Sequence, residues 1–282
     1  MVDVSVIIAA WNAQNTIVRA LQSALSQAGV TVEIIVADDA STDATHEIVT
    51  NLDDPRIRYV YLPVNRGPAA ARNAAIDAAA GKWLAVLDAD DMLLPGRLAQ
   101  LVGAATTHGL DIVTDNMLTE DPAGTRRLFL QEKLDGELQR LSVTDYVARN
   151  HMFKKRPSEG YLKPLFATGF LQHHAIRYDT GTRIGEDFLL VAEAMTLGAR
   201  YGRVRSAGYV YTIGTASVSR RLGRQDAEAM VAADRRFLSR HAARLDRAQR
   251  AAWPAARRRV RRRDGGVAQS PHDAGLLRAR PE

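Results

Sequence analysis

Short apolar runs alternate with amphipathic segments along the first hundred residues of the chain. The runs at residues 4–10, 32–37, 57–62 and 83–87 have the length and composition of strands. The segments between them repeat apolar residues three or four positions apart, as helices with one buried face do. Repeated alternation of strands and helices is typical of a parallel sheet with helices on both faces. The pattern therefore predicts an α/β fold, with a three-layer α/β/α arrangement and a mostly parallel central sheet.

Polar side chains directly follow three of these runs. They are Asn12 after the first run, Asp38 and Asp39 after the second, and Asp88, Asp90 and Asp91 after the fourth. Ligands of open parallel sheets bind outside the carboxyl ends of the strands. We therefore expect these side chains to contribute to one binding site.

The densest polar group is the segment Asp88-Ala89-Asp90-Asp91. Side chains alternate along an extended chain, so Asp88 and Asp90 should point the same way. Two carboxylates in that position repel each other unless a cation or hydrogen-bond donors lie between them. A hard divalent ion, held by one or two carboxylates and by substrate phosphates, would satisfy them. The alternative is a solvated acidic turn that caps the helix beginning near Pro95.

The chain beyond residue 95 is less regular. A helix is predicted at about 96–108 and a strand at 110–114. Residues 120–163, which include the basic stretch Lys154-Lys155-Arg156, suit either a substrate loop or a plain surface insertion.

Two pairs of residues in the second half are further candidates. His173 and His174 could bind a metal, but adjacent side chains point to different sides, so a structural role is the alternative. Glu186 and Asp187 open a predicted helix. They could only complement its dipole, or they could present a carboxylate to a cleft.

Composition excludes several classes of protein. The apolar fraction of 46% and the charged fraction of 25% are ordinary for a globular protein. No cysteine is present, which excludes disulfides, thiolate metal sites and cysteine nucleophiles. The sequence has neither a P-loop nor a Gly-x-Gly-x-x-Gly dinucleotide fingerprint after its first strand. The first apolar run is too short for a signal peptide or a membrane span, and no later run is long enough, so a cytoplasmic protein is expected.

The net charge of +6 is unevenly distributed. Residues 219–263 carry fifteen arginines against four acidic residues, which leaves residues 1–218 with a net charge of −4. The basic segment could adhere to an anionic membrane surface, or it could pack on the body as a solvated helix. No nucleic-acid partner is expected, because aromatic residues do not interleave with the arginines. Residues 264–282, rich in Gly, Ala, Ser and Pro, are expected to be disordered.

Five segments together resemble the family 2 glycosyltransferases, which are inverting nucleotide-sugar enzymes of the GT-A fold. The segments are Val4–Asn12, Glu33–Asp43, Asn65–Asn73, Leu87–Asp91 and Gly185–Asp187. They occur in the order and spacing of that family, and the resemblance spans about residues 3–219. The arginine-rich end is outside it.

The resemblance implies a donor site in the first half of the chain. The residues of this donor-nucleotide site would be Trp11, Asn12, Asp39, Arg72 and Asp88. Asp39 would accept hydrogen bonds from the N–H of the base, and Asp88 would contact the ribose hydroxyls or the uracil. Asp90 would hold Mn²⁺ or Mg²⁺ on the diphosphate, and Arg72 would pair with a phosphate. Asp91 would have a capping or supporting role.

The resemblance places the catalytic base in the second half. Asp187 would deprotonate the acceptor hydroxyl, and Glu186 would orient the acceptor. A distal group, formed by Ser217, Ser219 and Arg220, would close over the diphosphate. The implied reaction moves a single sugar from a UDP-sugar to a saccharide or lipid-linked acceptor in bacterial-type polysaccharide or glycolipid assembly. One base and no covalent intermediate imply inversion.

The expected organisation follows from these roles. Residues 1–100 would bind the donor and residues 101–218 would supply the acceptor site and the base. Residues 219–263 would form a basic helical extension and residues 264–282 a disordered tail.

The sequence departs from the family at the first strand end and at one turn. The usual Pro-Thr-Tyr is replaced by Ala9-Ala10-Trp11, so a hydroxyl contact to the base is missing. Ala40 stands where glycine is common. The Gln-x-x-Arg-Trp motif of processive synthases does not follow Asp187, so single-sugar transfer is expected.

Two other functions remain open at this point. A haloacid-dehalogenase-like phosphatase would use Asp88 as the nucleophile and Asp90 as acid and base. Its motif belongs on the first strand, whereas three strand–helix units precede Asp88 here. The other alternative is a non-catalytic nucleotide-binding or membrane-scaffold protein, which the change at Ala9-Ala10 would permit.

Overall fold

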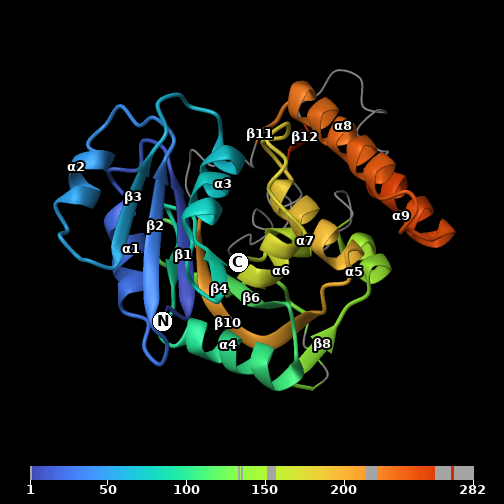
Figure 1. Ribbon diagram of the computed structural model, residues 1–282, viewed down its shortest axis with the longest axis horizontal. Coiled ribbons are helices and arrows are strands. Elements are labelled where there is room, and N and C mark those ends of the chain that lie inside the picture. The colour runs from blue at the N-terminus through green and yellow to red at the C-terminus, as the bar shows by residue number, and fades with distance from the viewer. Residues whose placement is uncertain are drawn as a thin grey trace, which may run out of the picture.

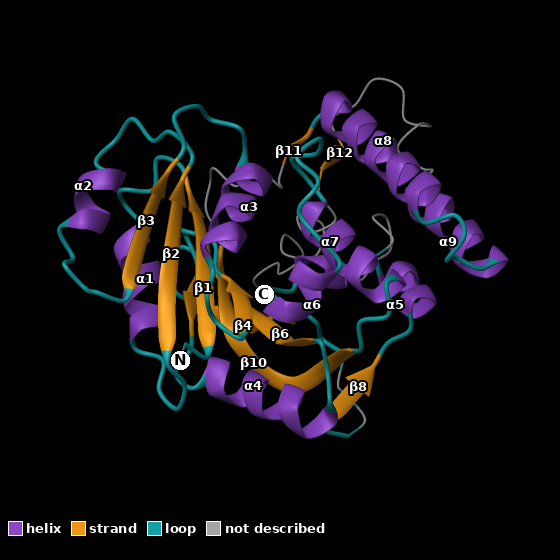
Figure 2. Ribbon diagram, viewed as in Figure 1, coloured by secondary structure: helices purple, strands orange, loops and turns teal. Residues whose placement is uncertain are grey.

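The central element is one mixed sheet (Figures 1 and 2). The computed structural model describes residues 2–132, 134, 136–150, 157–213, 221–257 and 268–269. Within these residues the sheet has ten strands. They are β1 Val4–Ala10, β2 Val32–Asp38, β3 Ile57–Tyr61, β4 Trp83–Val86, β5 Met92–Leu93, β6 Ile112–Glu120, β7 Arg126–Leu128, β8 Leu138–Arg140, β9 Leu165–Ala167 and β10 Tyr201–Thr212. A separate pair joins β11 (Arg221–Leu222) to β12 (Ala268–Gln269).

The strand order is β3-β2-β1-β4-β9-β6-β10-β5, with β7 beside β6 and β8 beside β10. Strands β1 to β4 are parallel to their neighbours in this group, and β6 is parallel to β10. Strand β9 lies antiparallel between β4 and β6. The amino end of β9 is therefore at the same edge of the sheet as the carboxyl end of β4. The prediction of a mostly parallel α/β sheet is confirmed.

Helices cover both faces of the sheet (Figure 1). Their bounds are α1 Ile17–Leu25, α2 Thr45–Thr50, α3 Pro68–Ala78, α4 Arg97–His108, α5 Val143–Arg149, α6 Thr168–His173, α7 Glu186–Thr196, α8 Arg224–Arg240 and α9 Arg247–Arg257, with a 3₁₀ turn η1 at Glu159–Tyr161. Alternate strand residues face alternate cores. Val6 and Ile8 join the core with α1 and α4, whereas Ile7 joins the core with α3 and α7.

Helix α3 lies close to the sheet because its buried face is built of alanines. Gly67 has φ of 88°, a left-handed conformation that favours glycine, and Pro68 then begins the helix. Ala71 and Ala75 are fully buried against β1 and β2. Small side chains bring the helix near the strand ends, so the same helix carries Arg72 into the protein.

The basic extension packs on the body through an apolar face. Its buried residues include Met230, Phe237 and Trp253, and the Trp253 ring lies 4.2 Å from Phe237 and 5.5 Å from Phe188 of α7. Arg236 and Arg240 form ion pairs with Asp179 and Glu193 of the body, respectively. For the described residues the packed arrangement is therefore observed. The dense basic block from residue 258 onward lies outside them.

Two features of the chain differ from the sequence prediction. The short run Tyr209-Val210-Tyr211 predicts a strand of three residues, whereas in the structure it is the carboxyl part of the twelve-residue strand β10. The strand β9 was not predicted, because its three residues lie between the irregular segment and α6. In the described part of the chain, no helix has the length and apolar character needed to cross a membrane.

Candidate active site

Five charged side chains from four elements meet at the carboxyl edge of the sheet. Asp88 follows β4, Arg72 comes from α3, Lys163 precedes β9, and Glu186 and Asp187 begin α7. These residues are more than 110 positions apart at the extremes, so only the fold brings them together. We call this group of five the charged cluster.

Arg72 contacts all three carboxylates of the charged cluster. Its Nη2 lies 2.7 Å from Asp88 Oδ1, and its Nη1 lies 2.8 Å from Glu186 Oε1 and 3.4 Å from Asp187 Oδ1. The side chain is only 6% exposed, and its guanidinium is 5.3 Å from the centre of the Tyr178 ring. A buried guanidinium is thus shared among three carboxylates.

Lys163 contacts two of the same carboxylates, and the sequence did not indicate it as a site residue. Its Nζ lies 2.8 Å from Asp88 Oδ2 and 2.7 Å from Asp187 Oδ2. The available signal was a single lysine between apolar neighbours, Leu162 before it and Pro164 after it. A lone charge within a buried-looking segment is expected to have a partner.

The cations and carboxylates of the charged cluster stabilise each other's ionised forms. Burial would raise the pKa of Asp88, but the charges of Lys163 and Arg72 outweigh it and hold that pKa below its usual value. Burial would lower the pKa values of Lys163 and Arg72, but Asp187 and Asp88 keep both raised. The pKa of Glu186 is raised, first by burial and then by the charge of Asp187. Asp88 is therefore firmly ionised, and Glu186 binds a proton more readily than an ordinary glutamate does.

Asp90 is the carboxylate best placed to hold a metal. Its side chain is exposed, and no ion pair to it is found in the described part of the chain. Desolvation by surrounding atoms and then the charge of Asp88 raise its pKa. The described residues contain no group of three His, Asp or Glu side chains arranged to hold a metal on their own. Asp90 thus fits a divalent ion that takes its other ligands from substrate phosphates and water.

Asp91 is buried beneath the site and is bound to strand β10. It is fully buried and accepts hydrogen bonds from Tyr209 Oη at 2.6 Å and from Thr212 N at 2.8 Å. The Tyr209 hydroxyl in turn accepts a hydrogen bond from the backbone N of Asp88 at 3.1 Å. Burial, followed by the charge of Asp88, raises the pKa of Asp91 well above its ordinary value. Asp91 therefore connects the turn after β4 to strand β10.

Asp39 organises the loop that leads into α3. Its two carboxylate oxygens accept hydrogen bonds from Arg66 N at 2.8 Å and Gly67 N at 2.7 Å. Each oxygen retains a second lone pair for another donor. Asn12, with φ of 50°, accepts a hydrogen bond from Thr42 N at 2.8 Å, and Trp11 beside it is 57% exposed. An exposed ring, a polar turn and a carboxylate thus lie along neighbouring strand ends.

Some predicted site residues lie elsewhere. Thr168, at the start of α6, donates its backbone N–H to Lys82 O at the amino end of β4. Helix α6, which ends at His173 and has His174 as its C-cap, therefore begins at the opposite edge of the sheet from Asp88, and the two histidine rings lie 4.7 Å apart. Ser217, Ser219 and Arg220, and the basic residues 154–156, lie outside the described residues. At Ala40, φ is 60°, a conformation in which glycine would be unstrained.

Comparisons with known proteins agree on one family for this chain. The profile of "Glycosyl transferase family 2" matches residues 5–162. The chain is 44% identical over 241 residues to the succinoglycan biosynthesis protein ExoO of Rhizobium meliloti (strain 1021), covering 85% of this chain and 69% of that protein. Over 99 residues it is 40% identical to WfaP of Escherichia coli, described as UDP-Glc:alpha-D-GlcNAc-diphosphoundecaprenol beta-1,3-glucosyltransferase, covering 35% of this chain and 39% of that protein.

Solved structures share the fold. The chain superposes on S. aureus TarS 1–349 in complex with UDP-GlcNAc with a TM-score of 0.67 and 21% identity. The match covers 84% of this chain and 66% of that one, so this chain spans a little under two thirds of the solved protein. At this identity the likeness establishes the fold alone.

Proposed function

Because this chain belongs to glycosyl transferase family 2 and has its GT-A fold, we propose that it moves one sugar from a UDP-sugar to a hydroxyl of a saccharide or lipid-linked acceptor in bacterial polysaccharide assembly. The observation that carries this proposal is the charged cluster. It joins Asp88, at the end of the donor-side strand, to Asp187, at the start of α7. Residues 1–100 would bind the donor, and residues 101–218 the acceptor.

The proposed donor site uses the carboxyl ends of the first strands. Trp11 would lie against the base, Asp39 would accept from its N–H, and Asp88 would contact the ribose. Asp39 and Asp88 are held by backbone N–H groups and by cations, respectively, so neither needs to reorganise when the nucleotide binds. Two similar proteins, one solved in complex with UDP-GlcNAc and one named as a UDP-Glc glucosyltransferase, support a UDP-sugar.

Asp187 would act as the general base. Its Oδ2 is held by Lys163, whereas its Oδ1 is 3.4 Å from Arg72 and is the less engaged oxygen. Oδ1 would therefore take the proton from the acceptor hydroxyl as that oxygen attacks the anomeric carbon. A single displacement with one base inverts the anomeric centre. Glu186, which is buried and paired with Arg72, would orient the acceptor.

A divalent ion fits the site at Asp90. When bound, Mn²⁺ or Mg²⁺ would offset the charge that grows on the leaving diphosphate. Asp90 would supply the protein ligand. Arg72 is engaged with carboxylates in this structure, so a phosphate contact of Arg72 would require it to exchange one of them.

Binding of nucleotide and metal tests the proposal. We expect UDP and UDP-sugars, with Mn²⁺ present, to raise the unfolding temperature by about 5 °C at roughly 100 times Kd, because they bind only the folded chain. Asp90→Asn should lose the metal-dependent part of the shift, and Asp77→Asn, an exposed carboxylate of α3, should keep it. Thermal-shift measurements over UDP, GDP, ADP and CDP, with and without Mn²⁺, check this. The absence of any response by the unmodified chain would contradict the proposal.

The phosphatase alternative does not agree with these findings. Family membership contradicts it, and both oxygens of Asp88 are held by cations, which lowers the nucleophilicity of that carboxylate. The non-catalytic alternative makes a separate prediction, that loss of the Asp187 carboxylate leaves function unchanged.

A further inference from the structure

Lys163 spans the proposed donor and acceptor halves of the site. Its Nζ contacts Asp88 Oδ2 at 2.8 Å and Asp187 Oδ2 at 2.7 Å, and its side chain is 7% exposed. The two carboxylates come from different elements and are 99 residues apart in the sequence. The Lys163 ammonium therefore bridges them on their Oδ2 side, and Arg72 contacts both on their Oδ1 side.

The backbone at Lys163 is held by a hydrogen bond to a buried ion pair. Its carbonyl oxygen accepts a hydrogen bond from Arg97 Nη2 at 2.5 Å. Arg97 is paired with Asp115 at 2.8 Å, and both side chains are 1% exposed. Asp115 also accepts from the backbone N of Gly208 at 2.7 Å, next to Tyr209. A buried ion pair of α4 and β6 thus holds both Lys163 and the strand that carries Tyr209.

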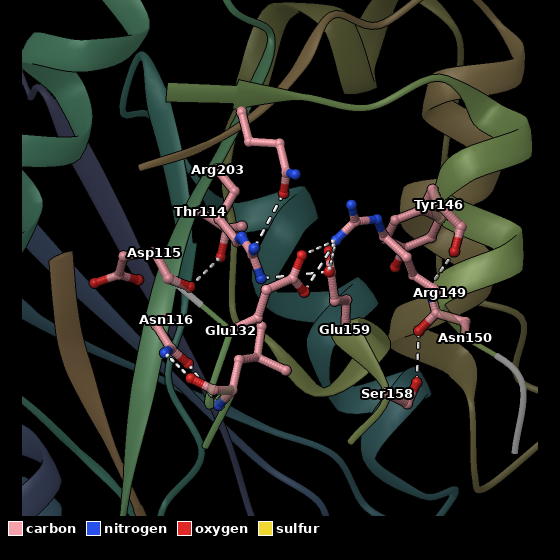
Figure 3. A network of polar contacts seen from close by, with 12 residues as sticks. Thr114, Asp115, Asn116, Glu132, Tyr146, Arg149, Asn150, Ser158, Glu159 and Arg203 are labelled. Carbon is pink, nitrogen blue, oxygen red and sulfur yellow. Dashed lines mark hydrogen bonds and ion pairs between the residues drawn. The ribbon is translucent and has the colours of Figure 1, made fainter. Parts of the chain in front are cut away.

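The turn before Lys163 is anchored as well (Figure 3). Glu159 of η1 is buried and pairs with Arg149 of α5 at 2.9 Å and with Arg203 of β10 at 3.3 Å. Asn150, at the end of α5, accepts a hydrogen bond from Ser158 Oγ at 2.5 Å. These contacts join the turn to the helix and strand on either side of it.

We propose that Lys163 is a positioning residue that fixes the carboxylate of Asp187 relative to Asp88, and so aligns the acceptor hydroxyl with the anomeric carbon of the bound donor. This inference rests on the proposed function. An ammonium has three donors, and in the described structure two of them have carboxylate acceptors.

The physical reason is the sensitivity of the displacement to geometry. A misplacement of about 1 Å can lower the rate of a reaction between bound groups by about 10²-fold. Without Lys163, Oδ2 of Asp187 and Oδ2 of Asp88 would repel each other across the space that the ammonium fills. Asp187 would then rotate or move away, while Asp39 and the turn at Asn12 would be untouched.

The first test compares turnover with donor affinity in Lys163→Met, Lys163→Arg and the control Lys82→Met, all in the full chain. Lys82 is exposed at the opposite end of β4. With UDP-glucose and Mn²⁺, we expect Lys163→Met to lower kcat for UDP release by about 10²-fold. Its affinity for UDP, measured by calorimetry, should stay close to that of the unmodified chain, and Lys163→Arg should recover part of kcat. An unchanged kcat, or an equal loss of kcat and UDP affinity, would overturn the inference.

The second test needs no activity. Unfolding midpoints of Lys163→Met, Asp88→Asn, Asp187→Asn and the two double variants give the coupling of Lys163 to each carboxylate. If Lys163 bridges the two carboxylates, each double variant should lose less stability than the sum of the losses in its two single variants. Additive losses with either carboxylate would overturn the inference. The proposed function fails on a different result: the unmodified chain would then neither bind UDP nor release it from a UDP-sugar.

Discussion

Asp187→Asn is expected to lower turnover by about 10²–10⁴-fold, the usual contribution of a general base. Asparagine preserves the shape of the side chain but cannot accept the proton of the acceptor hydroxyl. The proposed donor site at Asp39, Asp88 and Asp90 lies on other elements, so UDP affinity should change little. Loss of kcat with donor binding retained identifies an interaction that acts in the transition state. Release of UDP and calorimetric titration with UDP measure the two quantities.

A matched substitution separates this result from a general effect of removing a carboxylate. Asp77→Asn removes an exposed carboxylate from α3, outside the charged cluster. It should leave turnover within about twofold of the unmodified chain, because Asp77 is outside the charged cluster and surface substitutions usually change stability little. If Asp187→Asn also kept full turnover, the non-catalytic interpretation would replace the base mechanism.

Arg72→Met should have the second large effect, on the free energy of unfolding. Methionine leaves Asp88, Glu186 and Asp187 without their shared buried guanidinium, and Lys163 contacts only two of them. Removing one partner of a buried ion pair typically costs about 3–5 kcal/mol. Urea denaturation measures the loss. Arg177→Met, which breaks the exposed pair with Asp77, should cost no more than about 1 kcal/mol.

The loss in Arg72→Met should depend on pH. Arg72 helps to hold the folded-state pKa of Asp88 below the unfolded value of about 3.9. A lowered carboxyl pKa stabilises the fold above the unfolded pKa, and that contribution disappears as the pH falls through the folded pKa. The difference between the unmodified chain and Arg72→Met should therefore be largest near neutral pH and should shrink below about pH 4. A difference that did not change with pH would contradict the charge-based explanation.

The sequence predicts the strand ends of this site well because they depend on local patterns. An apolar run followed directly by polar residues indicates a buried strand with its carboxyl end at an edge. The parallel order of β1, β2 and β4 then brings Asn12, Asp39 and Asp88 to one side. The sequence marks Asp187 only as a carboxylate at the start of a helix, and its role as the base came from the resemblance, because no local pattern places the start of α7 beside β4.

Lys163 could not be predicted in this way because it depends on an exception to the parallel order. β9 has only three residues and is antiparallel to β4 and β6. That reversal turns its amino end, with Lys163 before it, toward Asp88. Short strands are weak sequence signals, and the direction of a strand is decided by its neighbours in the sheet.

The basic extension shows a different limit. Val231 and Leu238 lie at helical spacing, which predicts an apolar stripe through them. Both are only partly buried, and the adjacent Met230 and Phe237 are buried instead. A rotation of the helix by about one residue accounts for the difference. The ring of Trp253 on α9 favours this orientation, because it stacks on Phe237. Contacts between two helices thus decided which of two similar apolar faces became the core.

The anomeric configuration of the first product tests the central claim most directly. Proton NMR can follow the sugar released or transferred from an α-linked UDP-sugar, before mutarotation mixes the anomers. A single displacement by a hydroxyl that Asp187 deprotonates predicts a β product. An α product would require a second displacement or a covalent intermediate, and it would contradict the divided site with one base.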